Sequence, residues 1–198
     1  MGLTPLAHDQ LATIVTTLRM DARPTPKPIP ESHLRLAHWP APPPSAYLTL
    51  FCRVGAPWLW FSRLTLDDDA LVAIIHDERV EIHAVVDPAG TEIGMVELDF
   101  REPGSCEIAY FGLVPELAGH GHGRWLMAET LMRAWRAGVE RVGVNTCTLD
   151  SPHALGFYRA QGFQPVRRTV ETFADPRAAG VLPDDAAPQI PYLATRRR

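Results

Sequence analysis

Three glycines at alternate positions stand between an apolar run and an amphipathic segment. They are Gly119, Gly121 and Gly123, in the stretch LVPELAGHGHGR over 113–124. Glycine tolerates positive φ and lets a ligand approach the backbone, and the amides of a helix's first turn have no internal partners. The pattern therefore predicts a strand, a turn and a helix start that bind a pyrophosphate. The spacing excludes the dinucleotide-binding fingerprint, because no ribose-binding acid is correctly placed.

A carboxylate early in the preceding apolar run could act as a general base. Glu107 is the second residue of CEIAYFGLV over 106–114, and a carboxylate with a raised pKa accepts protons near neutral pH. The alternative is a carboxylate at a strand edge that faces solvent. The reserve candidates are Glu97 and Asp99 on the preceding predicted strand.

A tyrosine beyond the glycine-rich stretch could donate a proton. Tyr158 lies in SPHALGFYRAQGF over 151–163, and its phenol could donate a proton or a hydrogen bond to a leaving group. The alternative is an aromatic core residue that packs beside Phe157 and Phe163.

Aromatic residues also supply candidates for a substrate pocket. Trp58 and Trp60 follow the sequence Gly-Ala-Pro, and they either form the wall of a pocket or fix a proline-rich segment onto the core. Tyr110 is a further candidate. It comes three positions after Glu107, so it lies on the opposite face of a regular strand unless a β-bulge intervenes.

Metal and thiol chemistry are not expected. His120 and His122 alternate with the glycines, but no third ligand occurs at a telling spacing, so we expect imidazoles that face solvent or phosphate. Cys106 and Cys147 offer a covalent route, but neither has a recognisable histidine partner.

Composition limits the class of protein. The chain has 198 residues, 46% of them hydrophobic, with a net charge of -4 and a pI near 6.0. This length fits one domain, and the charge gives no reason to expect nucleic acid or an anionic membrane as partner. Three cysteines inside apolar runs predict a reducing compartment. The absence of a leader-like start and of a run of ~20 apolar residues adds to the expectation of a cytoplasmic protein.

Apolar spacing predicts a helix over 5–20, and the prolines of 23–44 predict an extended arm. Such an arm could be a flexible linker or a ligand for a partner, but Leu34, Leu36 and Trp39 favour packing on the domain. The segment 47–54 has strand composition. The remaining predicted elements are a helix over 65–77 capped by Thr65, strands over 80–87, 92–100 and 106–114, a helix after the glycines that stops at Gly138, a strand over 141–149, a helix over 151–161 and a strand over 163–173.

Two blocks resemble the GCN5-related N-acetyltransferase (GNAT) superfamily. LVPELAGHGHGRWL over 113–126 resembles the pattern V-x-P-x-x-R-G-x-G-x-G, and SPHALGFYRAQGF is similar to N-x-x-A-x-x-x-Y-x-x-x-G-F. The resemblance implies a single α/β domain over 45–173, with a mixed, mostly antiparallel twisted sheet flanked by helices. A helix and Pro-rich arm over 1–44 precede it, and a tail of doubtful order over 174–198 follows.

The resemblance also implies roles for individual residues. The Leu113 amide would bind a thioester carbonyl, the glycine loop would hold the pyrophosphate of acetyl-CoA, Glu107 would be the base and Tyr158 the general acid. Ala118 and Ser151 depart from the family's usual Arg or Gln and Asn. The implied cofactor-binding positions are Leu113, Val114, Ala118, Gly119, His120, Gly121, His122, Gly123, Arg124 and Ser151.

These features predict an N-acetyltransferase that moves an acetyl group from acetyl-CoA to the amine of a small molecule by direct attack in a ternary complex. A primary amine with a pKa near 10.4 costs roughly 4 to 5 kcal/mol to present unprotonated at pH 7, which explains the need for a base. The alternatives are a non-catalytic acyl-CoA sensor, an acyltransferase for a protein amine, and a longer acyl donor. The last strand and the arm could serve a homodimer interface.

Overall fold

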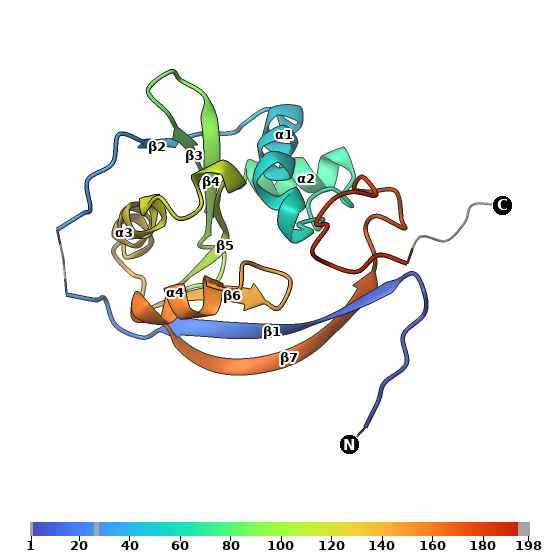
Figure 1. The fold of residues 1–198 in the computed structure, drawn as a ribbon. Helices are drawn as coiled ribbons and strands as arrows, with labels where there is room; N and C mark the ends of the chain where they lie inside the picture. The colour runs from blue at the N-terminus through green and yellow to red at the C-terminus, as the bar shows by residue number, and fades with distance from the viewer. Residues whose placement is uncertain (1, 26–27, 194–198) are drawn as a thin grey trace.

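The computed structural model describes residues 2–25 and 28–193, and its seven strands form one mixed sheet (Figure 1). The strands are β1 (Gln10–Met20), β2 (Arg35–His38), β3 (Val80–Val86), β4 (Glu92–Asp99), β5 (Ser105–Leu113), β6 (Arg141–Cys147) and β7 (Gln164–Ala174). Their order is β2-β3-β4-β5-β6-β1-β7. The pair β5 and β6 is parallel, and the other neighbouring pairs are antiparallel. The expected mixed, mostly antiparallel sheet is thus confirmed.

Helices cover both faces of the sheet. They are α1 (Pro44–Gly55), α2 (Asp68–Ile75), α3 (His122–Ala134) and α4 (Ala154–Ala160), with short 3-10 turns η1 (Ala56–Trp58) and η2 (Pro115–Leu117). Helix α1 packs on β4 and β5, and α3 lies on the other side of the sheet (Figure 1). Neighbouring residues of β5 show the two faces, because Gly112 lies against Val54 of α1 whereas Phe111 stacks on Phe157 of α4.

The expected helix over 5–20 is wrong, because residues 10–20 form strand β1 between β6 and β7. Its side chains alternate, with Leu18 and Met20 buried and Arg19 exposed. The β-branched run of residues 13–17 favours a pleated strand over a helix. The division of the chain at residue 44 stays a prediction, although two strands of the first segment, β1 and β2, belong to the same sheet.

The expected strand over 47–54 is also wrong, since these residues lie in helix α1. Tyr47, Leu50, Phe51 and Val54 are its buried side chains, and their spacing is that of one helix face. Pro44 at the first helical position supports this start. Helix α2 confirms the predicted helix, but its cap is the Asp67 carboxylate, which accepts the Ala70 amide at 2.8 Å, and not Thr65.

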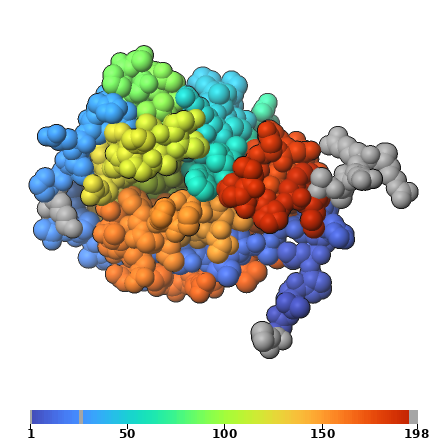
Figure 2. All heavy atoms as spheres, in the orientation of Figure 1, coloured from blue at the N-terminus to red at the C-terminus, as the bar shows by residue number. Residues whose placement is uncertain are grey.

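Both flanking segments are ordered where the structure describes them. Leu34 and Leu36 are buried and β2 pairs with β3, which confirms that the arm packs on the domain. The doubtful order expected for the tail is wrong over residues 175–193, which form a compact lobe beside η1 (Figure 2). Pro26 of the arm and the last residues of the tail, 194–198, lie outside the described residues.

A buried arginine organises this C-terminal lobe. The Arg177 side chain is 1% exposed, pairs with Asp175 at 2.8 Å, and donates to the carbonyls of Ala187 and Ile190. These acceptors satisfy the guanidinium inside the protein, so the polar, Pro-rich composition does not prevent packing. Three apolar residues of the lobe pack with Leu59, namely Leu182, Ala187 and Ile190.

Candidate active site

Strands β5 and β6 separate along their length. Their pairing runs from Ser105 opposite Arg141 to Ile108 opposite Val144, while β5 continues to Leu113. The Val114 amide donates to Ile93 of β4 at 2.9 Å. Because successive amides of a strand point to opposite edges, the Leu113 amide points away from β4 into the opening. Phe111 has the same parity, so two main-chain amides face a gap between the strands.

The glycine loop presents a second set of amides. Gly119 and Gly121 have φ of 80° and 84°, and helix α3 starts at His122. Among the described residues, the amides of Gly119, Gly121, His122 and Gly123 have no backbone acceptor. Adjacent unpaired amides at a helix start form an anion site. In the space-filling view a furrow separates α3 from the segment of β6 and α4 (Figure 2).

Tyr158 lies beside this opening, on α4. Its ring is 7% exposed and contacts Phe111, Phe157 and Phe163 at centroid distances of 5.6 to 6.2 Å. The core packing expected as the alternative role is therefore present. The structure gives its hydroxyl no hydrogen-bond partner among the described residues. Burial, and then the charge of Asp150, raise the pKa of Tyr158, so the phenol keeps its proton at neutral pH.

A β-bulge places Glu107 and Tyr110 on one face of the sheet. Asp99 lies opposite Glu107 and Glu97 lies opposite Tyr110, with an extra residue, Ala109, in β5 between them. Since Glu97 and Asp99 are two apart on one strand, their partners share a face. The opposite faces expected for a regular strand are thus overturned by the bulge. Glu107 comes directly before the last residue that pairs with β6.

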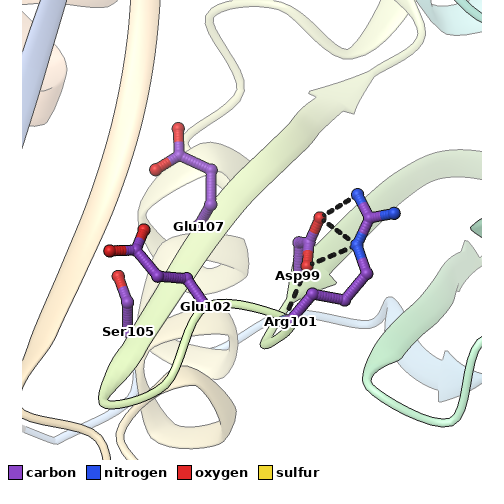
Figure 3. A pocket seen from close by; sticks show the side chains of 5 residues that line it. All are labelled: Asp99, Arg101, Glu102, Ser105 and Glu107. Atoms are coloured by element: carbon purple, nitrogen blue, oxygen red, sulfur yellow. Dashed lines mark hydrogen bonds and ion pairs between the residues drawn. The ribbon is translucent and has the colours of Figure 1, made fainter.

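The surroundings of Glu107 raise its pKa to about 7. Burial is the main cause, the neighbouring Asp99 charge adds to it, and a hydrogen bond from the Asn145 amide at 2.9 Å opposes it. Glu107 also lines a cavity of about 400 Å³ with other polar side chains (Figure 3). They are Asp99, Arg101, Glu102 and Ser105.

The two reserve carboxylates are engaged elsewhere. Glu97 is fully buried, pairs with Arg63 at 2.6 Å and accepts a hydrogen bond from Tyr47. Asp99 pairs with Arg101 (Figure 3), whose hydrogen bonds outweigh partial burial and lower the Asp99 pKa. Both reserve carboxylates are thus held by arginines, whereas Glu107 has no arginine partner among the described residues.

The sequence was compared with protein families and with curated proteins. A profile of the acetyltransferase (GNAT) family matches residues 33–163. The chain belongs to the GNAT family. Comparison with curated proteins finds no significant match.

Solved structures share the GNAT fold at low sequence identity. A conserved protein of unknown function from Staphylococcus epidermidis is 13% identical, with a TM-score of 0.56 over 84% of this chain and 63% of its own. A GCN5-related N-acetyltransferase from Sphaerobacter thermophilus is 16% identical, with a TM-score of 0.58 over 82% of this chain and 51% of its own. An aminoglycoside acetyltransferase from an uncultured soil sample is 17% identical, with a TM-score of 0.55 over 70% of this chain and 93% of its own. This GNAT chain therefore spans less than two thirds of the first two structures.

Other predicted loop residues have varied surroundings in this GNAT protein. The amides of Val114 and Ala118 are bonded to Ile93 and to Pro115, so neither points into the opening. The His122 ring lies 3.2 Å from the Ser32 hydroxyl, while His120 and Arg124 are exposed. Ser151 is not the cap of α4, which starts after His153, but its hydroxyl oxygen accepts the His153 amide at 3.4 Å.

The predicted aromatic wall is only partly assembled. Trp60 packs against Tyr110 at a centroid distance of 5.0 Å and against Phe51 of α1, and the Tyr110 hydroxyl is hydrogen-bonded to Ser62. Trp58, in η1, is half-buried and forms no aromatic pair within the part of the chain that the structure describes. The structure thus brings Trp60 and Tyr110 together without Trp58.

Sequence reasoning missed Asp150, which ends the turn after β6. Its carboxylate accepts hydrogen bonds from the Thr146 hydroxyl at 2.7 Å and the Cys147 amide at 2.9 Å. Burial raises its pKa, although these bonds and the nearby Trp60 side chain oppose the rise. The only signal in the sequence is that Asp150 precedes the second family block directly.

Across residues 2–25 and 28–193, His, Cys, Asp and Glu side chains do not gather in threes that could hold a metal ion. The same residues contain no helix with the length and hydropathy to cross a membrane.

Replacing Gly121 by alanine tests the anion site. A Cβ at φ of 84° costs roughly 1 to 2 kcal/mol, and relief of that strain would turn the loop amides away from the phosphates. We expect the affinity for CoA to fall about tenfold by calorimetry. Gly138 has the same φ of 84° after α3, so Gly138→Ala is the matched control. Equal losses in both variants would contradict a local role.

Replacing Glu107 by glutamine tests the raised pKa through stability. The folded-state pKa of about 7 exceeds the ordinary 4.5, so the stabilisation from the protonated carboxyl is complete below about pH 4.5 and is lost as pH rises through about 7. The free energy of unfolding of the wild type should fall by up to about 3 kcal/mol across that window. Glu107→Gln should lack this fall in urea titrations, whereas the exposed control Glu78→Gln should keep it. Parallel curves for all three proteins would show an ordinary pKa.

Proposed function

We propose that this protein transfers the acetyl group of acetyl-CoA to the amine of a small molecule within a ternary complex. The observation that carries the proposal is the opening between β5 and β6, where the Leu113 amide has no strand partner and the free amides of the glycine loop stand at the start of α3. A thioester carbonyl and a pyrophosphate need these two sets of donors.

When bound, acetyl-CoA supplies an activated acetyl group. The amides of Gly119, Gly121, His122 and Gly123 would hold its pyrophosphate, and the Leu113 amide would polarise the carbonyl oxygen. These donors fit because the described residues offer them no backbone acceptor. Negative charge that develops on the carbonyl oxygen is then stabilised without reorganisation of the backbone.

Glu107 takes up the proton of the amine through a chain of water molecules, because it lies six residues before Leu113 in β5, roughly 15 to 20 Å along the strand. A carboxylate with a pKa of about 7 is largely ionised at slightly alkaline pH, and it is a stronger base than an ordinary glutamate. The Tyr158 hydroxyl donates a hydrogen bond to the sulfur as the thiolate leaves. Because the pKa of Tyr158 is raised, we assign it this hydrogen bond and not complete transfer of its proton.

The acceptor lies on the face of β5 that carries Glu107 and Tyr110. Trp60 and Tyr110 provide an apolar side, and carboxylates line the cavity beside Glu107. This combination suits a small cationic amine, and the neighbouring fold of an aminoglycoside acetyltransferase supports the same class.

Calorimetric titration with CoA and desulfo-CoA, followed by thiol-release assays against a panel of amines, tests the proposal. We expect binding of both ligands, and release of CoA that depends on the amine and rises with pH around 7. Binding without amine-dependent release would favour an acyl-CoA sensor or a protein acceptor. No binding of CoA would overturn the proposal.

A further inference from the structure

Strand β7 forms an outer edge of the sheet, and nearly all of its side chains are exposed to solvent. Its residues from Gln164 to Thr172 are all exposed, on both faces, with Val170 at 72% and Val166 at 49%. Within the part of the chain that the structure describes, β1 is its only strand neighbour. A long exposed edge with apolar side chains is a template for a further strand.

The register identifies which backbone groups face outward. The Ile14 carbonyl of β1 accepts the Thr148 amide on the β6 side at 3.2 Å. The groups of the next residue, Val15, therefore face β7, where Val15 lies opposite Thr169. The backbone N–H and C=O of Thr169 therefore point toward β1, and those of Arg168 and Val170 point toward the free edge.

Charge then selects one arrangement for a second strand. In an antiparallel pair of two β7 strands with Thr169 opposite its own copy, Arg168 faces Val170 and Arg167 faces Glu171 of the other chain. The pairs of Arg168 and Val170 form backbone hydrogen bonds between the two chains. The pair of Arg167 and Glu171 is then not hydrogen-bonded through the backbone, and such pairs bring side chains closest. Shifting the register removes the opposite-charge pairing.

We propose that the protein forms a two-fold symmetric dimer through β7, with Thr169 on the axis and two Arg167 to Glu171 ion pairs across it. Within one chain, neither Arg167 nor Glu171 pairs with another described residue. The stem of Arg168 covers the exposed Val170 of the other chain. The two sheets thereby become continuous, and this inference is independent of acetyl transfer.

Sedimentation of the full chain tests the dimer. We expect a species of about 44 kDa, twice the 21.9 kDa chain, at concentrations of about 100 μM and dissociation on dilution. Arg167→Glu should weaken the dimer about tenfold, because it places like charges opposite each other twice. The double variant Arg167→Glu with Glu171→Arg should restore it. Arg159→Glu, at an exposed arginine of α4 outside β7, is the matched control and should have little effect.

Cross-linking tests the register. Thr169→Cys should form a disulfide-linked dimer under mild oxidation, because the two copies face each other in a pair without backbone hydrogen bonds. Thr172→Cys lies opposite Val166 and should stay unlinked, as should the wild type. A monomer at every concentration, a dimer indifferent to Arg167→Glu, or cross-linking through position 172 in place of 169 would overturn the proposal.

Discussion

Tyr158→Phe is expected to lower kcat for acetyl transfer about a hundredfold, the usual loss when one hydrogen-bond donor to developing charge is removed. The affinity for CoA should stay within about threefold, since the phenol hydroxyl contacts only the leaving sulfur in our proposal. Stability should change little, because the ring keeps its contacts with Phe111, Phe157 and Phe163 and the hydroxyl has no partner to lose among the described residues.

The measurement is steady-state kinetics of thiol release, with calorimetry of CoA binding alongside it. Tyr192→Phe is a suitable control, because that hydroxyl lies in the C-terminal lobe and contacts Asp184. The dependence of kcat on pH should have the same shape in the variant and the wild type, since the raised pKa of Tyr158 keeps the proton on the phenol throughout the neutral range. An unchanged kcat would reduce Tyr158 to a core aromatic.

The parts of the site that local sequence specifies were predicted well. The glycine loop, the hairpin of β3 and β4, and helix α3 all depend on residues close together in the chain, and Gly119 and Gly121 adopt the positive φ expected of them. The position of Glu107 relative to Tyr110 was not predictable. It depends on one bulged residue, Ala109, which has no turn signature of its own.

The failures concern segments whose partners are distant. The β-branched run of β1 was a local signal for a strand, but helical spacing was given more weight because the partners β6 and β7 lie more than 100 residues away. The apolar residues of α1 have the spacing of a helix face, but their composition is also that of a strand, and packing against β4 and β5 agrees with the helix. The C-terminal lobe depends on one buried residue, Arg177, whose acceptors are main-chain carbonyls that composition cannot reveal.

Arg63→Met is expected to lower the free energy of unfolding by about 3 to 5 kcal/mol, the largest stability effect we predict. The Arg63 side chain is 13% exposed and Glu97 is fully buried, so the variant leaves a carboxylate in the core whose one remaining side-chain donor among the described residues is the Tyr47 hydroxyl. Burial lowers the Arg63 pKa, but the Glu97 charge, the neighbouring Tyr110 and the hydrogen bond to Glu97 together raise it above its ordinary value.

Chemical denaturation measures this loss. The double variant Arg63→Met with Glu97→Met should recover most of the stability, because no buried charge remains. Arg79→Met removes an exposed pair with Asp77 and should have a much smaller effect, because solvent screens exposed charges. Arg63 also lies over the Tyr110 ring, 5.1 Å from its centroid. A loss of stability as small as that of Arg79→Met would mean that the Arg63–Glu97 pair does not stabilise this face of the sheet.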